Sequence, residues 1–140
     1  MKKLIESIKR HEGYRDEVYL DSKGLPTCGW GHLLWVGSKV PKEAVEAFFK
    51  QDLADALVSY HDLSFQHRKQ LQDSRTRQRV VIEMLFNMNL QKVLQFKKFW
   101  AAVDSGDWTE AKKELLDSKW HRDVGKRAEE LAEIFEKGGD

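Results

Sequence analysis

The 140-residue sequence has a single cysteine, Cys28, and only two prolines. One cysteine cannot form an intramolecular disulfide, which excludes a disulfide-stapled secreted domain and is compatible with a reducing compartment. No apolar run approaches the ~20 residues that a membrane-spanning helix requires, so no stable membrane association is expected. Residues 1–6 are basic at first but are not followed by an apolar segment. The sequence therefore predicts no signal peptide.

The sequence also lacks a large excess of either charge. Its formal net charge is +1, with 34% charged and 41% hydrophobic residues. This balance is typical of a soluble globular protein and argues against a strongly cationic binder of nucleic acid or of anionic membranes. The five histidines show no spacing of metal ligands, so no metal site is predicted.

Hydrophobic spacing and turn residues predict an α+β fold dominated by helix. Residues 3–12 have helical spacing and end before Gly13, whereas residues 14–35 are rich in glycine and aromatic residues and indicate a small β-region. From Pro41 onward the chain reads as helices. The predicted helical ranges are 41–60, 75–88, 90–103, 108–117 and 124–136.

A chain of this length suits one domain, which we assign to residues 1–140. Residues 14–60 are expected to form a small β-containing lobe with a connecting helix, and residues 1–12 and 61–140 a helical lobe. A cleft between the two parts would be the natural substrate site.

The register of the predicted hairpin determines which side chains share a face. If Ser22, Lys23 and Gly24 form a three-residue loop with Gly24 in the left-handed conformation, Asp21 pairs with Leu25. Asp21 and Thr27 are then diagonal neighbours on one face, whereas a two- or four-residue loop would separate them.

The most informative segment is the stretch 11–34, which contains Glu12, Asp21 and Thr27. Two carboxyl groups in different environments can divide acid and base work, which is the basis of glycoside hydrolysis. The segment resembles the catalytic motif of the phage-type lysozymes, in which Glu is followed by Asp or Cys and then by Thr at these spacings. That resemblance implies a lysozyme-like fold of a small β-hairpin lobe and a helical bundle lobe.

Later segments resemble the same family and occur in the same order. They are residues 49–53 (Phe-Lys-Gln-Asp-Leu), residues 81–88 (Val-Ile-Glu-Met-Leu-Phe-Asn-Met), residues 118–121 (Ser-Lys-Trp-His) and the pair Arg127-Ala128. Between His32 and Pro41 this chain is shorter than the T-even type of the family, and a helix of the small lobe is expected to be missing.

Three residues receive catalytic roles. Glu12 is the predicted general acid, since partial burial against Tyr or Trp would keep its carboxyl group protonated. Asp21 is predicted to accept the proton of the attacking water, and the Thr27 hydroxyl to hold that water below the sugar ring. A surface position for Glu12, a turn-capping role for Asp21 and a plain strand position for Thr27 are the structural alternatives.

The resemblance implies supporting and substrate-binding residues as well. Arg127 would pair with Glu12, where its positive charge opposes protonation, and His32 would form an ion pair with Asp52. The predicted glycan contacts are Leu33, Phe86, Asn87, Phe99 and Glu114. Phe99 and Glu114 differ in type from the family's residues at those positions, which allows a changed substrate preference, including a chitin-like polymer.

The resemblance implies a peptidoglycan hydrolase, an endolysin-type muramidase that cleaves the β-1,4 bond between N-acetylmuramic acid and N-acetylglucosamine with inversion. It implies no metal and no cofactor, a monomer, and a holin-type membrane partner that gives access to the wall. The enzyme would stay in the host bacterial cytoplasm until lysis and then reach the periplasm and cell wall. The alternatives are a lytic transglycosylase, which needs no base for water, and a non-catalytic module that binds nucleic acid through residues 66–80.

Overall fold

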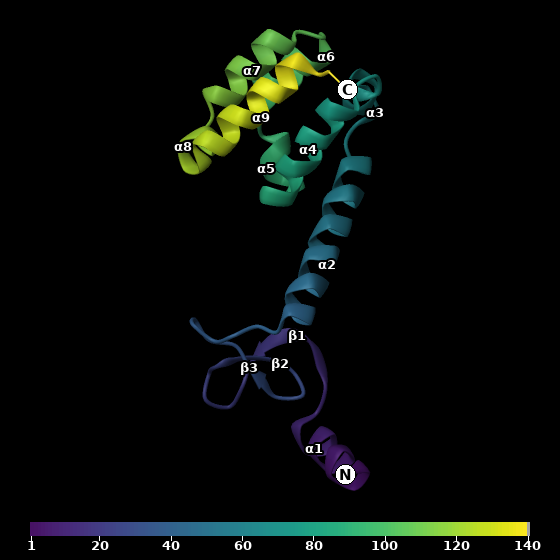
Figure 1. Ribbon diagram of the computed structural model, residues 1–140, viewed down its shortest axis with the longest axis vertical. Helices are drawn as coiled ribbons and strands as arrows, with labels where there is room; N and C mark the ends of the chain where they lie inside the picture. The colour runs from purple at the N-terminus through teal and green to yellow at the C-terminus, as the bar shows by residue number, and fades with distance from the viewer. Residues whose placement is uncertain (140) are drawn as a thin grey trace. The chain divides into compact units, whose positions relative to one another are not determined.

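The computed structural model describes residues 1–139, over which the chain forms nine helices and three strands. The chain divides into two compact units, Met1–Val45 (unit 1) and Glu46–Asp140 (unit 2). Figure 1 shows the small sheet in the first of these and a group of helices in the second. The predicted α+β class, dominated by helix, is confirmed.

Unit 1 begins with helix α1 (Lys2–Glu12). Its apolar residues Leu4, Ile5 and Ile8 follow the predicted helical spacing. The helix ends before Gly13, which has a φ of 70°. Glycine adopts this conformation without the steric penalty of a Cβ atom, which explains why the helix stops there.

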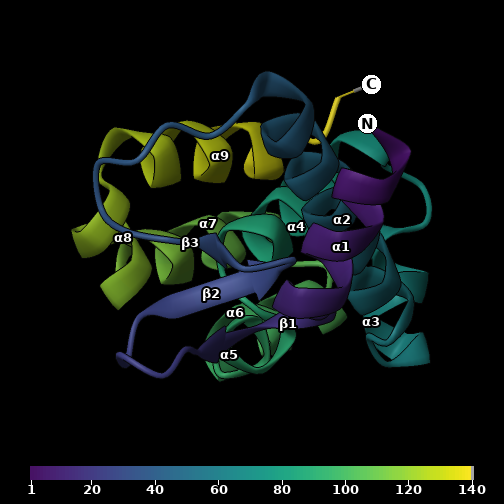
Figure 2. The ribbon, with the colours of Figure 1, turned by 90° about the horizontal axis from the view of Figure 1, so that it is seen from below.

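An antiparallel sheet follows, made of β1 (Arg15–Leu20), β2 (Pro26–Gly29) and β3 (His32–Leu33). Its strand order is β1-β2-β3, and Figure 2 shows β2 between the other two strands. Tyr19 lies opposite Thr27, which is the register that a three-residue hairpin loop predicted.

Unit 2 is helical. After α2 (Lys42–His61), which starts at the end of unit 1, its helices are α3 (Phe65–Leu71), α4 (Arg75–Asn87), α5 (Leu90–Leu94), α6 (Lys97–Asp104), α7 (Trp108–Leu116), α8 (Lys119–Val124) and α9 (Lys126–Lys137). Helix α9 packs along α7, as Figure 1 shows for the yellow and green helices. Among the described residues, every buried apolar side chain lies in this unit. The largest of them include Leu71, Met84, Phe99, Leu115 and Phe135.

Side chains at the helix starts explain much of this helical path. Ser64, Ser74, Asn89, Asp107 and Ser118 each accept a hydrogen bond from the backbone N–H three residues later. These bonds satisfy N–H groups that have no partner within the helix. Hydrophobic spacing did not predict helices α3 and α8, which begin directly after the capping residues Ser64 and Ser118.

One predicted helix is wrong in its extent. Residues 90–103 form two helices, α5 and α6, and Phe96 between them has a non-helical ψ of 64°. The Trp100 indole N–H donates a hydrogen bond to the Val93 carbonyl at 2.9 Å across this break. Burial of Trp100 and satisfaction of its indole N–H therefore favour a bend that the apolar spacing does not reveal.

The predicted division of the domain differs from these compact units, because unit 1 includes α1 together with the sheet. The assignment of residues 1–12 to the helical lobe, and of residues 14–60 to the small lobe, concerns how the two units meet. It stays a prediction.

Candidate active site

Glu12 is the last residue of α1, and its side chain reaches the turn between β2 and β3. Gly31 lies in that turn with a φ of 72°, and a Cβ atom at this position would collide with the Glu12 carboxylate. Within unit 1 the carboxyl group is exposed rather than partly buried. Desolvation that keeps it protonated would therefore have to come from outside unit 1.

Asp21 follows β1 directly and organises the hairpin loop. Its Oδ1 atom accepts hydrogen bonds from the backbone N–H groups of Lys23 and Leu25, both at 2.9 Å. Gly24 completes the loop with a φ of 79°, which confirms the predicted left-handed conformation. Asp21 thus has the turn-capping role that was the structural alternative for it. Its Oδ2 atom accepts no hydrogen bond from residues 1–139 and stays available for a second role.

Thr27 lies on β2 and is 2% exposed. Its hydroxyl group donates a hydrogen bond to the Leu25 carbonyl at 2.9 Å. The hydroxyl proton is therefore engaged, and the oxygen can act only as an acceptor towards water. Burial and this hydrogen bond restrict the Thr27 side chain more than an exposed strand position would.

The backbone of Leu25 connects Asp21 and Thr27. Its N–H group donates to the Asp21 carboxylate, and its carbonyl accepts from the Thr27 hydroxyl and from the Asp21 backbone N–H at 2.9 Å. Two predicted site residues are thereby fixed to the backbone of one hairpin residue. Sequence reasoning missed Leu25 and Gly31 as positioning residues. The glycine-rich stretch around Gly31 was the only available signal for the latter.

In unit 2, two of the predicted residues line one apolar groove. Phe86 and Arg127 border a hollow of about 580 Å³ whose other walls come from α2 and α4. The rings of Phe86 and Phe49 lie 5.6 Å apart between centroids. Arg127 contacts Glu83 through its Nη2 atom at 3.4 Å. The predicted pairs of Arg127 with Glu12 and of His32 with Asp52 each join residues of different units, and they stay predictions.

Asn87 is held by a neighbour from a distant segment of the chain. The indole N–H of Trp120 donates a hydrogen bond to the Asn87 side-chain oxygen at 2.8 Å. Because Trp120 is 4% exposed, this bond positions the Asn87 amide at the end of α4. Leu33 is 36% exposed on β3 and is accessible, as a glycan contact would require.

The structure corrects the prediction for Phe99. Its side chain is 1% exposed and packs against Trp100 and Phe135, with ring centroids 5.0 and 5.2 Å away. A ring buried in this way cannot stack on a sugar face. Glu114 lines a hollow of about 330 Å³ that Phe99 also borders, and it remains accessible.

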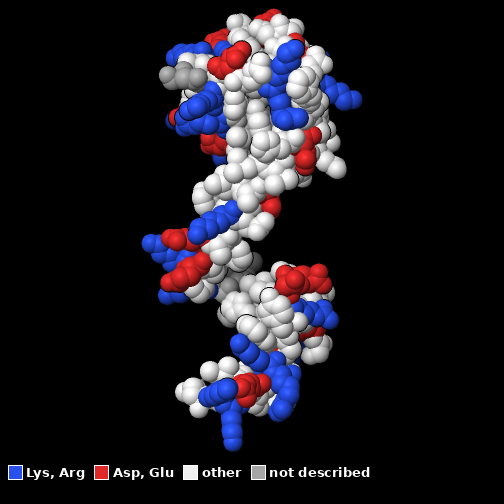
Figure 3. Space-filling view, turned by 90° about the vertical axis from the view of Figure 1, so that its right-hand side faces the viewer, with Lys and Arg blue, Asp and Glu red and all other residues white. Residues whose placement is uncertain are grey.

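The segment 66–80, the candidate nucleic-acid-binding segment, does not present all of its basic residues to solvent. Arg77 donates hydrogen bonds to the carbonyls of Phe135 and Glu136, both at 2.8 Å, and lies 3.9 Å over the Trp108 ring. It belongs to the packing of α4 against α9. On the face of unit 2 that Figure 3 displays, blue and red side chains are mixed. This distribution offers no extended cationic surface to nucleic acid on that face.

A search of residues 1–139 finds no group of three or more His, Cys, Asp or Glu side chains that could hold a metal ion. None of the helices described has the length and apolar character needed to cross a bilayer.

Comparison with known proteins identifies a family. A family model described as "Phage lysozyme" matches residues 9–133. The chain is 28% identical to the pre-baseplate central spike protein Gp5 of Enterobacteria phage T4 over 159 residues, covering 96% of this chain and 28% of that protein. It is 26% identical to probable T4-type lysozyme 1 of Dictyostelium discoideum over 158 residues, covering 95% of this chain and 93% of the other. Probable T4-type lysozyme 2 of the same organism is 26% identical over 161 residues, with 96% and 94% covered.

The lengths of these matches are informative in themselves. The chain spans 28% of the spike protein but more than nine-tenths of each Dictyostelium protein. The alignments run over 158 to 161 positions, more than the 140 residues available, so the relatives contain residues that this chain lacks. A shortened member was predicted, while the place of the missing residues stays a prediction.

Proposed function

The chain belongs to the phage lysozyme family, and from this premise we propose that it is a muramidase that hydrolyses the β-1,4 bond between N-acetylmuramic acid and N-acetylglucosamine. Family membership makes the chain a glycoside hydrolase, with peptidoglycan as the substrate at the level of the family. We propose which bond is cleaved, with which stereochemistry, and which residues take part.

One observation carries the proposal beyond the family. Asp21 and Thr27, which the motif predicts to bind one water molecule, are both hydrogen-bonded to the backbone of Leu25, one to its N–H and the other to its carbonyl. A shared anchor fixes their separation, which is what positioning of a nucleophilic water requires. Each also keeps an oxygen that can accept a proton or a hydrogen bond, namely Oδ2 of Asp21 and Oγ1 of Thr27.

The proposed reaction is a single displacement. Glu12 gives its proton to the glycosidic oxygen as the bond from that oxygen to the anomeric carbon breaks. Water attacks the anomeric carbon from the opposite face, and its proton passes to the Asp21 carboxylate. The Thr27 oxygen accepts the second hydrogen bond of this water and so orients its lone pair towards the carbon.

Inversion follows from this division of work, because water enters opposite the departing oxygen. The β-linked substrate then yields an α-configured reducing end. The Glu12 carboxyl group is exposed within unit 1, and we propose that the bound glycan removes water from it and favours its protonated form.

We also propose that the glycan is contacted by Leu33, Phe86, Asn87 and Glu114, as predicted. The biological setting is proposed on the same basis: lysis of a bacterial host by a monomer that is released from the cytoplasm to the wall with the help of a holin-type partner. The family includes proteins with different names and lengths, such as a phage spike protein. The setting therefore needs its own test.

The decisive experiment replaces Glu12 by Gln. The amide cannot donate the proton, so clearing of outer-membrane-permeabilised cells should fall by about 10²- to 10⁴-fold. The matched control is Glu6→Gln on the same helix, since Glu6 makes only a surface contact with Lys2 at 4.0 Å. Circular dichroism should show both variants folded. Clearing by Glu12→Gln at the wild-type rate would refute the proposal.

Analysis of the products separates hydrolysis from transglycosylation. The proposed reaction gives reducing ends that first appear in the α configuration by NMR. Anhydro sugars would assign the chain to lytic transglycosylases instead. A β-configured first product would show retention and remove the proposed role of Asp21.

A further inference from the structure

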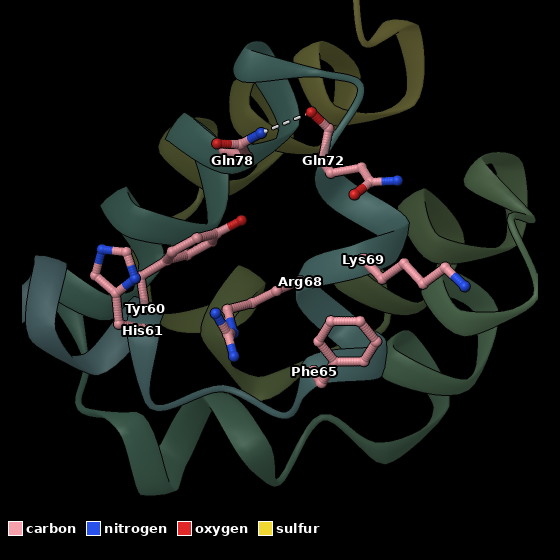
Figure 4. A pocket seen from close by; sticks show the side chains of 7 residues that line it. All are labelled: Tyr60, His61, Phe65, Arg68, Lys69, Gln72 and Gln78. Atoms are coloured by element: carbon pink, nitrogen blue, oxygen red, sulfur yellow. Dashed lines mark hydrogen bonds between the residues drawn. The ribbon is translucent and has the colours of Figure 1, made fainter.

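Unit 2 contains a second hollow, which the proposed hydrolase mechanism does not use. It lies between the end of α2 and helix α3 and has a volume of about 270 Å³. Its lining is shown in Figure 4 and consists of Tyr60, His61, Phe65, Arg68, Lys69, Gln72 and Gln78. This lining contains two permanent cations, several hydrogen-bond donors and no carboxylate.

Tyr60 gives the first indication of a ligand. Its side chain is only 9% exposed, and its hydroxyl group forms no hydrogen bond with any residue of the described chain. The hydroxyl oxygen reaches solvent, since no fully buried polar side-chain atom among the described residues lacks a partner. Figure 4 shows this hydroxyl pointing into the opening, on the side of Gln72. Burial raises the pKa of Tyr60, and the nearby Arg68 opposes this only in part. The phenol therefore keeps its proton and is a permanent donor at the base of the hollow.

Arg68 provides a second, independent donor. Its Nε atom donates to the Leu63 carbonyl at 3.1 Å, which fixes the side chain between α2 and α3. Its two terminal nitrogens form no hydrogen bond or ion pair with residues 1–139 and so present an oriented fork. A guanidinium held by one nitrogen and open at the other two is suited to an oxyanion.

The rim of the hollow provides a further positive charge and a fixed wall. Lys69 is exposed and is in no ion pair within the described part of the chain. The neighbouring His67 is already engaged by Asp104 at 2.6 Å, so it does not compete for a ligand. Gln78 bonds to the Leu71 and Gln72 carbonyls at 3.0 and 3.3 Å and fixes the opposite wall.

We propose that this hollow is a binding site for one phosphate group, with Tyr60, Arg68 and Lys69 as its donors. A tetrahedral phosphate offers more acceptor oxygens than a carboxylate and matches donors that approach from different directions. Phe65 is 72% exposed beside the site and provides an apolar surface for the carbon atoms that carry the phosphate.

The source to which we commit is the phosphodiester of a polyol-phosphate polymer that accompanies peptidoglycan in a cell wall, and this choice rests on the proposed function. A membrane surface or a nucleic acid would require an extended cationic face, whereas the chain has a net charge of +1. A concave site for one phosphate, beside an apolar ring, fits a flexible polymer better. Such a site would hold the enzyme on its insoluble substrate.

The first test is titration of the full chain with inorganic phosphate, followed by amide NMR shifts. Saturable shifts are expected around Tyr60, Arg68 and Gln72, and equal concentrations of chloride should not reproduce them. Tyr60→Phe keeps the ring but removes the unpaired hydroxyl, and phosphate binding should weaken about five-fold. Lys69→Gln should weaken it about three-fold. Lys113→Gln, an exposed lysine on α7 outside the site, should leave it unchanged.

The second test separates the sources of phosphate. Poly(glycerol phosphate) should bind wild type and bind Tyr60→Phe more weakly. Vesicles of phosphatidylglycerol and a DNA duplex should not show this dependence on the hydroxyl group. Binding only to vesicles or only to DNA would overturn the assignment to a wall polymer.

The absence of saturable phosphate shifts, or identical shifts in Tyr60→Phe, would overturn the site itself. Failure of the phosphate site and failure of the hydrolase proposal can be distinguished. Tyr60→Phe should retain clearing of cells that lack the polymer, and Glu12→Gln should retain phosphate binding.

Discussion

The two units of this protein are stabilised in different ways. In residues 1–45, all of which the structure describes, Thr27 is the one buried side chain, and the local order comes from hydrogen bonds and glycine conformations. Unit 2 contains the buried apolar side chains, with Met84, Leu115 and Phe135 at 0% exposure. The candidate catalytic side chains thus belong to the part of the molecule with the least packing.

This difference indicates how the site tolerates change. Hydrogen bonds to the backbone of Leu25 position Asp21 and Thr27 over a short stretch of chain, with little dependence on side-chain packing. In unit 2, by contrast, each helix depends on several others through shared apolar contacts. We therefore expect substitutions in unit 2 to change stability first and those in unit 1 to change activity first.

The largest effect on stability is expected for Phe135→Ala. The side chain contacts the rings of Phe99 and Trp108, with centroids 5.2 and 5.8 Å away, and its loss leaves a cavity. The free energy of unfolding should fall by about 3 to 5 kcal/mol in urea denaturation. The neighbouring Ile134→Ala, at a position 36% exposed, should cost clearly less. Equal losses for the two would contradict the description of the core.

The sharpest test of unit 1 is Gly31→Ala. The added methyl group meets the Glu12 carboxylate and also forces alanine into a positive φ. Displacement of a catalytic group by about 1 Å can cost on the order of 10²-fold in rate, so clearing activity should fall by about that factor.

The matched control is Gly37→Ala, where φ is 92° but no atom lies within 4 Å of the added Cβ. It introduces backbone strain of about 1 to 2 kcal/mol without touching Glu12. If both alanine variants lose the same activity, strain alone explains the effect and the contact with Glu12 has no catalytic meaning.

A smaller effect is expected from Ser74→Ala at the start of α4. The Ser74 hydroxyl accepts from the Arg77 N–H at 3.1 Å and donates to the Gly138 carbonyl at 2.9 Å. Loss of a helix cap together with a partly buried hydrogen bond should lower the free energy of unfolding by about 1 to 2 kcal/mol. Ser64→Ala removes a cap at an exposed site and should cost less, with clearing activity unchanged in both variants.

The smallest effect is a pH dependence in unit 2. The hydrogen bond with Glu129, then that with the Leu116 carbonyl, raises the pKa of His121 above its ordinary value of 6.5. The stabilisation that protonated His121 provides is complete below 6.5 and is lost as the pH rises through the raised pKa. As the pH rises above 6.5, the difference in unfolding free energy between wild type and His121→Gln should shrink. A pKa below 6.5 by NMR would contradict this.

The local structure of unit 1 could be predicted from the sequence to a large extent. Glycine at 24 permits the left-handed loop residue, and that loop length fixes Tyr19 opposite Thr27, because side chains alternate along a strand. The predicted break at Gly13 and the helix before it were also confirmed. These features depend on residues close together in the chain.

The features that were not predicted have other causes. The burial of Phe99 and the inward course of Arg77 depend on partners from distant segments. The interruption at Phe96 accompanies a hydrogen bond between the Trp100 indole and the Val93 carbonyl, which apolar spacing does not reveal. Arg77 and Phe135, for instance, are 58 residues apart in the sequence. A periodic pattern identifies an apolar face, but it does not specify what that face contacts.

The sequence by itself determined the class of fold, the hairpin register and the three candidate catalytic residues, because each depends on backbone conformation and spacing within about twenty neighbouring residues. Only the tertiary structure decided that Glu12 reaches Gly31, that Leu25 anchors both Asp21 and Thr27, and that the Tyr60 hydroxyl faces an open hollow without a partner. The physical reason is that side-chain contacts and burial depend on distances in space. Those distances are fixed only when the chain folds, even for residues as near in sequence as Asp21, Leu25 and Thr27.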